Sequence, residues 1–138
     1  PMQWTAGAQA GFTSGTPWLR VNPNHVEINA EAETREPHGI YAHYRALIRL
    51  RKTQRVIQDG DYTPLLAGHP QIFAYRREND EASLVVLANF YGEVAKAPLA
   101  DTAGYRLLLG NYPDSPATLE EDVLLRPYEA LVYLRQKV

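Results

Sequence analysis

The hydrophobic periodicity of this chain changes once, at Gly60, and that change limits the folds that the sequence can adopt. Before Gly60, apolar residues in the segment 38–57 recur every three or four positions, which is the spacing of one buried helical face. After Gly60, apolar and polar residues alternate in short runs separated by turn residues, as they do in β-strands. The sequence therefore predicts an α+β fold in which one long helix precedes a mostly antiparallel β-domain.

The predicted helix, residues 38–57, reads HGIYAHYRALIRLRKTQRVI. Pro37 favours a helix start at this point and Gly60 favours a helix end shortly after it. Arg45, Arg49 and Lys52 fall on the face expected to contact water. The opposite face carries four apolar residues, which we call the helix stripe: Ile40, Tyr44, Leu47 and Ile48.

Four segments after Gly60 have the composition of strands: 72–77, 83–90, 105–111 and 128–135. The connections between them are too short for crossover helices, so we expect antiparallel pairing in a small sandwich or curled sheet. The last segment is apolar on both faces, which predicts burial on both. Four aromatic residues in these apolar runs are expected to belong to the core: Tyr75, Phe90, Tyr128 and Tyr133.

Residues 1–37 contain three glycines and four prolines, which interrupt any regular period. We expect this segment to be irregular, with at most a turn of structure. Trp4, Phe12 and Trp18 lie within it and need a surface to cover them, since large aromatic side chains are seldom left exposed. Long irregular loops are uncommon by themselves, so the segment is predicted to be part of something larger.

Composition excludes several classes of protein. The net charge of −2 argues against a general nucleic-acid binder. No apolar run approaches the roughly 20 residues of a membrane span, so we expect no membrane partner. The chain has no cysteine, which excludes disulfides and thiolate metal sites and is consistent with the cytoplasmic location that we expect.

The acidic residues do not form an obvious catalytic pair. Most adjacent acids lie in predicted turns, at 31–33, 80–81 and 120–122, where solvated carboxylates are expected. Glu129 is different because it sits inside an apolar strand. An ion pair between Glu129 and either Arg126 or Arg135 is favoured over a catalytic role.

The histidines do not form an obvious metal site. His38 and His43 are five residues apart, which turns them about 140° from each other on a helix. His25 and His69 lie in proline-containing loops, where we expect exposed rings. No phosphate loop, dinucleotide fingerprint or Gly-x-Ser-x-Gly sequence is present. We therefore predict no metal, no cofactor and no catalytic residue in this chain.

The first 29 residues carry a cluster of short motifs: PMQW, GF, GTPW, VNPN and IN. Together with YRALIRLRK, FAYRR, LVVLANF and LRPYEALVYL, they resemble the alpha-glucosidase branch of glycoside hydrolase family thirteen. That branch contains oligo-1,6-glucosidase, dextran glucosidase, trehalose-6-phosphate hydrolase and sucrose isomerases. We treat eleven residues as the structural motif: Pro1, Met2, Gln3, Trp4, Gly11, Phe12, Pro17, Trp18, Asn22, Pro23 and Asn24.

The resemblance implies a division of the chain. Residues 1–59 would be the tail of a catalytic (β/α)8 barrel, with a loop at 1–37 and the last barrel helix at 38–57. Residues 60–138 would be a C-terminal antiparallel β-domain of the alpha-amylase type. The family's nucleophile Asp, acid/base Glu and stabilising Asp are expected upstream of Pro1, so substrate would be bound through the parent barrel only.

Two departures from the family pattern leave substrate preference open. Thr5 and Ala6 follow PMQW where acidic residues are usual, and His25 follows VNPN where Tyr is common.

The preferred hypothesis is that the chain is the non-catalytic C-terminal portion of a retaining alpha-glucosidase acting on short oligosaccharides. A stand-alone carbohydrate-binding domain, with two or three coplanar aromatic rings on an exposed strand face, is the alternative, as is a structural interaction domain. Phosphotrehalase and sucrose isomerase are alternative parent activities. Because the helix stripe would pack on barrel strands that this chain lacks, we also expect self-association through the helix and residues 1–37.

Overall fold

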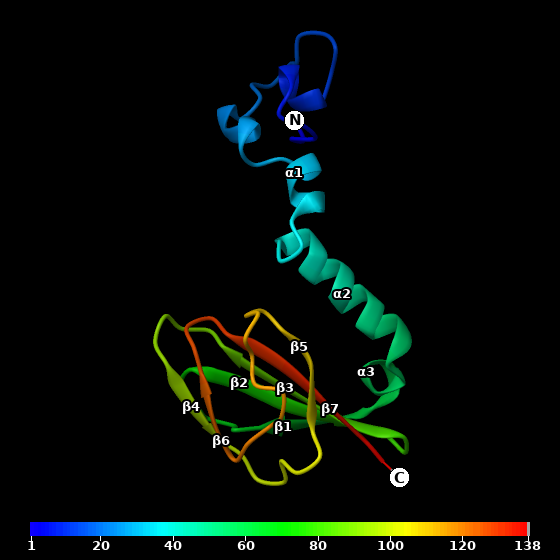
Figure 1. Ribbon diagram of the computed structural model, residues 1–138, viewed down its shortest axis with the longest axis vertical. Helices are drawn as coiled ribbons and strands as arrows, with labels where there is room; N and C mark the ends of the chain where they lie inside the picture. Colours follow the sequence, from blue (N-terminus) through cyan, green and yellow to red (C-terminus); the bar gives the residue numbers. More distant parts are fainter. Residues whose placement is uncertain (138) are drawn as a thin grey trace. The chain divides into compact units, whose positions relative to one another are not determined.

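A computed structural model describes residues 1–137, so Val138, which the predicted β-domain includes, lies outside the described residues (Figure 1). The chain divides into two compact units, Pro1–Ile48 and Arg49–Val138. Among the described residues, no helix combines the length and apolar character that a membrane crossing requires. The α+β class with a mostly antiparallel sheet is confirmed.

The first unit contains more helix than the sequence predicted. Two 3-10 turns, η1 (Ala8–Gly11) and η2 (Pro23–Val26), are followed by the helix α1 (Ala30–Arg35). The prediction of at most a turn of structure in 1–37 is therefore wrong for α1. Asn29 starts this helix, since its side-chain oxygen accepts a hydrogen bond from the Ala32 N–H at 2.9 Å.

The predicted helix 38–57 is two helices, α2 (Ile40–Thr53) and α3 (Arg55–Asp59). Gln54 lies between them in an extended conformation, with φ −107° and ψ 101°. The break has a tertiary cause, because α3 turns Val56 and Ile57 onto the sheet of the second unit. Helix propensity is a weak preference that such packing overrides.

Seven strands make up two antiparallel sheets in the second unit (Figure 1). The larger sheet has the order β1-β2-β3-β7-β5 and the smaller one pairs β4 with β6. The strand bounds are β1 Asp61–Leu65, β2 Ile72–Glu78, β3 Ala82–Asn89, β4 Ala95–Pro98, β5 Arg106–Gly110, β6 Asp122–Leu125 and β7 Ala130–Gln136.

The four predicted strands correspond to β2, β3, β5 and β7, and three further strands were missed. β4 and β6 have four residues each, which is too short for an alternating pattern to stand out. β1 contains Pro64 and is largely exposed, as suits the edge strand that it forms.

The larger sheet has packed residues on both faces. Its inner face packs against the smaller sheet, and the main core residues are Ile72, Ala74, Val85, Leu87, Ala95, Ala97, Tyr105, Leu119, Val123, Leu125, Leu131 and Tyr133. Its outer face packs against α3 through Val56, Ala82 and Leu84. β7 contributes to both faces, with Leu131 and Tyr133 fully buried on one and Val132 and Leu134 partly buried on the other, so the predicted two-sided burial is confirmed.

Two of the four predicted core aromatics are exposed. Phe90 is 66% exposed and Tyr128 is 65% exposed, whereas Tyr133 is fully buried and Tyr75 is partly buried. Phe90 follows the end of β3, and Tyr128 has a left-handed φ of 55° in the turn before β7 begins. Both residues lie outside the strands whose alternation had suggested their burial.

Limited proteolysis should remove the first unit and leave the second intact, because nearly all buried apolar residues lie between Val56 and Tyr133. Trypsin is expected to cut first at exposed sites such as Arg20, Arg35 and Arg45. Since Val56 is buried against the sheet, the resistant fragment should begin before α3 rather than at Asp61. Mass spectrometry of the time course reads this out, and early cleavage within β3 would contradict it.

Candidate functional site

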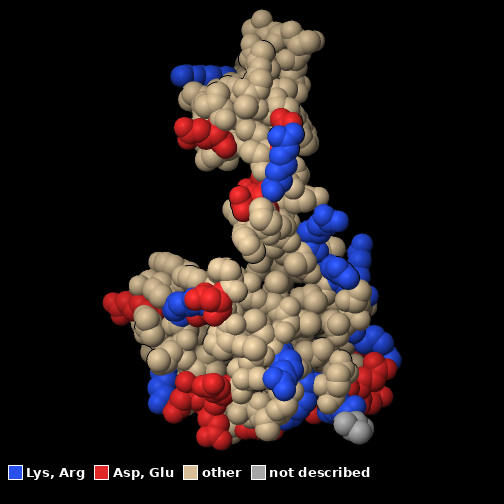
Figure 2. Space-filling model, viewed as in Figure 1, with Lys and Arg blue, Asp and Glu red and all other residues tan. Residues whose placement is uncertain are grey.

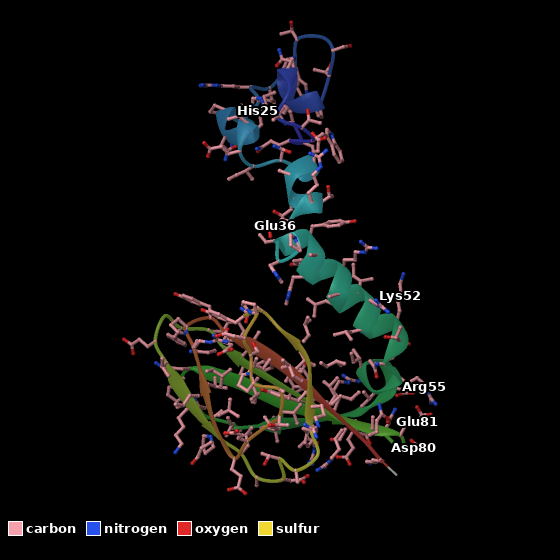
Figure 3. All side chains as sticks on the ribbon, in the orientation of Figure 1. His25, Glu36, Lys52, Arg55, Asp80 and Glu81 are labelled. Atoms are coloured by element: carbon pink, nitrogen blue, oxygen red, sulfur yellow. The ribbon has the colours of Figure 1, made fainter. Side chains whose placement is uncertain are left out.

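Of the acids predicted to be solvated in turns, those at 80–81 and 120–122 are exposed, whereas Glu31 and Glu33 lie in α1 and Glu33 is partly buried. Arg55 donates hydrogen bonds to Glu81 Oε1 at 2.7 Å and to Asp59 Oδ2 at 2.9 Å, and Arg55 and Glu81 lie side by side (Figure 3). All three side chains are substantially exposed. Exposed ion pairs contribute little to stability, and these acids form no enclosed pair for proton transfer.

Glu129 is the one carboxylate that the structure buries among the described residues, with 1% of it exposed. It pairs with Arg126, at 2.6 Å from Nη2 to Oε1, while Arg135 pairs with Asp101 instead. The backbone N–H of Arg126 donates to Glu129 Oε2 at 2.8 Å. Of the two partners that the sequence left open, Arg126 is therefore the right one.

Arg126 connects Glu129 to a wider set of contacts that we call the Arg126 cluster. Its Nη1 donates to Asp114 Oδ1 at 2.6 Å, and its guanidinium stacks 3.9 Å from the ring centre of Tyr112. Burial pulls the pKa of Glu129 upward, but the hydrogen bonds from Arg126 outweigh burial and leave that pKa below its ordinary value. An ionised carboxylate with these partners is unsuited to act as a general acid near neutral pH.

His25 and His69 are partly buried, so the expectation of exposed rings is wrong. His25, labelled in Figure 3, places Nδ1 3.0 Å from the carbonyl oxygen of Asn22. His69 Nδ1 accepts from the backbone N–H groups of Gln71 and Ile72, at 3.2 and 3.0 Å. Both rings thus fix loop conformation. No metal-binding group of three His, Asp or Glu residues occurs in the part of the chain that the structure describes.

The structural motif forms a hydrogen-bonded frame within the first unit. Gln3 Nε2 donates to Asn24 Oδ1 at 2.9 Å and to the carbonyl oxygen of Ile28 at 2.5 Å. Asn29 is buried, and its Nδ2 donates to the carbonyl oxygen of His25 at 2.9 Å. The side-chain amides therefore connect Gln3 with the segment 24–29 and fix the fold of that segment, because buried polar groups need partners.

A left-handed turn closes the frame at residues 9–11. Gln9, Ala10 and Gly11 have φ values of 51°, 55° and 66°. The carbonyl oxygen of Ala10 accepts from the N–H groups of Trp4 and Thr5 at 2.9 and 3.0 Å. A left-handed conformation costs roughly 1–2 kcal/mol per non-glycine residue, so these bonds offset local strain.

Thr5 accounts for one departure from the family pattern. Its Oγ1 accepts a hydrogen bond from the Gly7 N–H at 3.2 Å, which is the turn bond that an Asp side chain at the same position could also make. A side-chain oxygen is thus retained in this turn although the charge is not.

The motif aromatics are exposed within this chain. Trp18 is 86% exposed, and Trp4 and Phe12 are each exposed by about half. The surface that these side chains were expected to need is therefore not supplied by the described residues. The structure shows that the motif positions backbone and amide groups, while its large rings remain available for contacts outside the chain.

An open apolar pocket of about 680 Å³ lies between the motif and the start of α2, inside the first unit. Its polar lining groups serve the frame: Asn29 caps α1, and Glu33 Oε1 accepts from the Tyr41 N–H at 2.9 Å. Its apolar lining includes Pro1, Met2, Trp4, Ile28, Ile40 and Tyr44. The pocket offers apolar surface rather than groups for catalysis.

Comparison with known proteins shows which family the two parts of the chain resemble. Residues 1–60 match the family described as "Alpha amylase, catalytic domain", and residues 72–132 match "Alpha-amylase SusG C-terminal domain". The chain therefore belongs to the alpha-amylase family, glycoside hydrolase family thirteen. Its relatives there are oligo-1,6-glucosidases and trehalose-6-phosphate hydrolases.

The similarity extends over nearly the whole chain. The oligo-1,6-glucosidase of Halalkalibacterium halodurans is 42% identical over 97% of this chain and 24% of its own length. The crystal structure of Bacillus licheniformis trehalose-6-phosphate hydrolase has a TM-score of 0.89 at 37% identity, over 99% of this chain and 25% of that one. A variant of the trehalulose synthase MutB has a TM-score of 0.85 at 35% identity, over 99% and 25%. The chain spans about a quarter of the length of the curated relatives that it matches.

Proposed function

We propose that this chain is the non-catalytic C-terminal portion of a retaining alpha-glucosidase that acts on alpha-glucosidic bonds of short oligosaccharides. One observation carries the proposal: a segment similar to a catalytic domain, residues 1–60, runs directly into one similar to an alpha-amylase C-terminal domain. Residues 1–59 then complete a barrel, with a loop at 1–37, and residues 60–138 form the β-domain. The proposed parent is cytoplasmic.

The described carboxylates support the absence of catalysis in this portion. A retaining glycosidase needs a nucleophile and an acid/base carboxyl about 5 Å apart, one of them with a raised pKa. Glu129 is committed to Arg126, and its pKa is lowered rather than raised. The catalytic acids are accordingly proposed to precede Pro1 in the parent, which alone binds the alpha-glucoside.

A carbohydrate-binding domain is the second candidate, because aromatic rings are exposed on the larger sheet. Tyr62 and Tyr75 are 5.4 Å apart between ring centres, Phe73 and Tyr75 are 5.7 Å apart, and Phe73 and Phe90 are 6.5 Å apart. The corresponding interplanar angles are 34°, 54° and 71°. A platform for stacking sugars needs coplanar faces, so these tilted rings favour the first proposal.

The names of two similar solved structures support two alternative activities for the parent enzyme. Trehalose-6-phosphate hydrolase supports a phosphotrehalase, and trehalulose synthase supports a sucrose isomerase. Both remain alternatives to the alpha-glucosidase.

The purified 138-residue chain is expected to release no p-nitrophenol from p-nitrophenyl alpha-glucoside, even at high protein concentration. Calorimetric titration of the same preparation with isomaltose, trehalose-6-phosphate and sucrose should give no binding heat, because only a carbohydrate-binding domain would respond. Turnover that disappears in a Glu129→Gln variant would overturn the proposal, and saturable sugar binding would favour the second candidate.

A further inference from the structure

One histidine of the second unit makes a set of hydrogen bonds that only a neutral ring can make. His69 lies in the loop 66–71 between β1 and β2, and its Nδ1 is 3.2 and 3.0 Å from the backbone nitrogens of Gln71 and Ile72. Its Nε2 is 3.1 Å from the carbonyl oxygen of Lys96 in β4. A backbone N–H can only donate and a carbonyl oxygen can only accept, so Nδ1 is unprotonated and Nε2 carries the proton.

The His69 ring joins the two sheets of the second unit. The loop 66–71 connects two strands of the larger sheet, whereas Lys96 belongs to the smaller sheet. Leu65 and Leu66, next to the ring in sequence, are partly buried against the main core. Separating the ring from its partners would therefore loosen the loop and the end of the edge strand β1.

The backbone of this loop is held in an unfavourable conformation. Leu66 has a left-handed φ of 51° and Gly68 has a φ of 91°. The carbonyl oxygen of Leu66 accepts a hydrogen bond from the backbone N–H of His69 at 2.9 Å. A left-handed conformation is unfavourable for a residue other than glycine, so the bonds around His69 help to keep the loop in this shape.

Protons from the solvent can reach the ring. His69 is partly buried, and it lines an open pocket of about 600 Å³ together with Phe73, Phe90 and Tyr91. The ring is thus held by specific bonds without being sealed from water.

The charged groups on the neighbouring elements do not change their charge in the range where histidine titrates. Between Asp61 and Arg76 the chain carries no charged side chain apart from His69 itself. β4 contributes Lys96, whose Nζ lies 3.0 Å from a carboxylate oxygen of Asp122 in β6, and the segment 90–94 contributes Glu93. Carboxylates ordinarily titrate below pH 5, and lysine and tyrosine near pH 10. His69 is therefore the group in this region whose charge responds between about pH 5.5 and about pH 7.5.

We propose that His69 is a proton-sensitive latch, by which we mean the ring and its bonds to Gln71, Ile72 and Lys96. The neutral ring holds the loop 66–71 against β4. On acidification a proton from water binds the lone pair of Nδ1, which then faces two N–H donors, so both bonds are lost and the loop is released.

The direction of the pH effect follows from the same bonds. In the unfolded chain nothing opposes a proton on His69, and an unperturbed imidazole takes up a proton at about pH 6.5. The stabilisation by the latch is thus fully present above about pH 6.5 and is lost as the pH falls below that value. All residues of the latch belong to the second unit, so the effect is independent of the proposed parent activity.

Hydrogen exchange of the 138-residue chain, followed by NMR at about pH 7.5 and about pH 5.5, tests the latch. After correction for intrinsic exchange rates, the protection of the Gln71 and Ile72 amides should fall several-fold at the lower pH. In His69→Asn the same amides should be equally protected at both pH values, because the asparagine Oδ1 can accept from both N–H groups and does not titrate. His25→Asn is the matched control and should leave the pH effect intact, since His25 Nδ1 faces a carbonyl oxygen that a protonated ring can also contact.

A second measurement needs no substitution, so it stands even if His69→Asn does not fold. Nitrogen NMR of the histidine rings in the native chain reports which ring nitrogen carries the proton. At about pH 7.5, His69 should show a protonated Nε2 and an unprotonated Nδ1.

Three results would overturn the latch. The first is a proton on His69 Nδ1 at about pH 7.5. The second is equal protection of the Gln71 and Ile72 amides at both pH values in the native chain. The third is a loss of protection in His69→Asn as large as that in the native chain, which would assign the pH effect to another group.

Discussion

The substitution Glu129→Gln is expected to lower the free energy of unfolding of the second unit by about 2 kcal/mol. Glutamine keeps the shape of Glu129 but loses the charge that Arg126 meets at 2.6 Å. Hydrogen bonds to charged groups contribute about 1.5–3 kcal/mol each. We expect a loss of unfolding free energy in the lower part of that range. The reason is that Arg126 is partly exposed and keeps its ion pair with Asp114.

Urea unfolding followed by far-ultraviolet circular dichroism is the appropriate measurement, since both tryptophans lie in the first unit and would not report on the sheet. Glu121→Gln provides a matched control with an exposed carboxylate, and its effect should stay within about 0.5 kcal/mol. Equal midpoints for the two variants would show that the Arg126 cluster does not stabilise the fold.

The ion pair between Glu129 and Arg126 also determines how the stability of the second unit changes with pH. The pKa of Glu129 in the folded protein lies below its ordinary value of 4.5, so the unfolded chain binds the proton more readily. The stabilisation is fully present above pH 4.5 and is lost as pH falls through the folded-state pKa. The unfolding midpoints of the native chain and of Glu129→Gln should therefore converge on acidification, and parallel curves would contradict this assignment.

Much of the β-domain could be predicted because its strands are long enough to show alternation. β2, β3 and β7 have seven or eight residues each, and their apolar runs were read correctly. The break at Gln54 could not be predicted, because it depends on Val56 packing against strands that follow later in the chain. α1 was missed since its six residues contain no apolar stripe.

The candidate site was predictable only where its contacts are local. The Glu129–Arg126 pair spans three residues, and the sequence named it as one of two choices. The Gln3–Asn24 bond spans 21 residues, so the motif could be recognised without showing what its amides do. The neighbouring rings of Tyr62, Phe73 and Tyr75 depend on strand register, which periodicity alone does not provide.

The isolated chain is expected to self-associate as its concentration rises, through the helix stripe and residues 1–37. Ile40, Tyr44, Leu47 and Ile48 are between 39% and 72% exposed, and Ile40 and Tyr44 also line the pocket beside the motif. Burying side chains of this size contributes roughly 1.5–3 kcal/mol each. Pairing two copies across a two-fold axis would cover both surfaces at once.

The double substitution Leu47→Ser and Ile48→Ser should make the chain monomeric in analytical ultracentrifugation while its sheet signal in circular dichroism is unchanged. Arg45→Ser with Arg49→Ser is the matched control, because the helical period puts both residues on the face of α2 opposite the helix stripe, so association should stay intact. Basic side chains lie along the region that Figure 1 labels α2 (Figure 2). A chain that stays monomeric at high concentration, with the amides of α2 strongly protected from exchange, would show that the stripe is covered within one molecule. Dissociation by Phe73→Ser instead would assign the contact to the exposed aromatic side chains of β2, since only the surface that pairs should respond to a polar substitution.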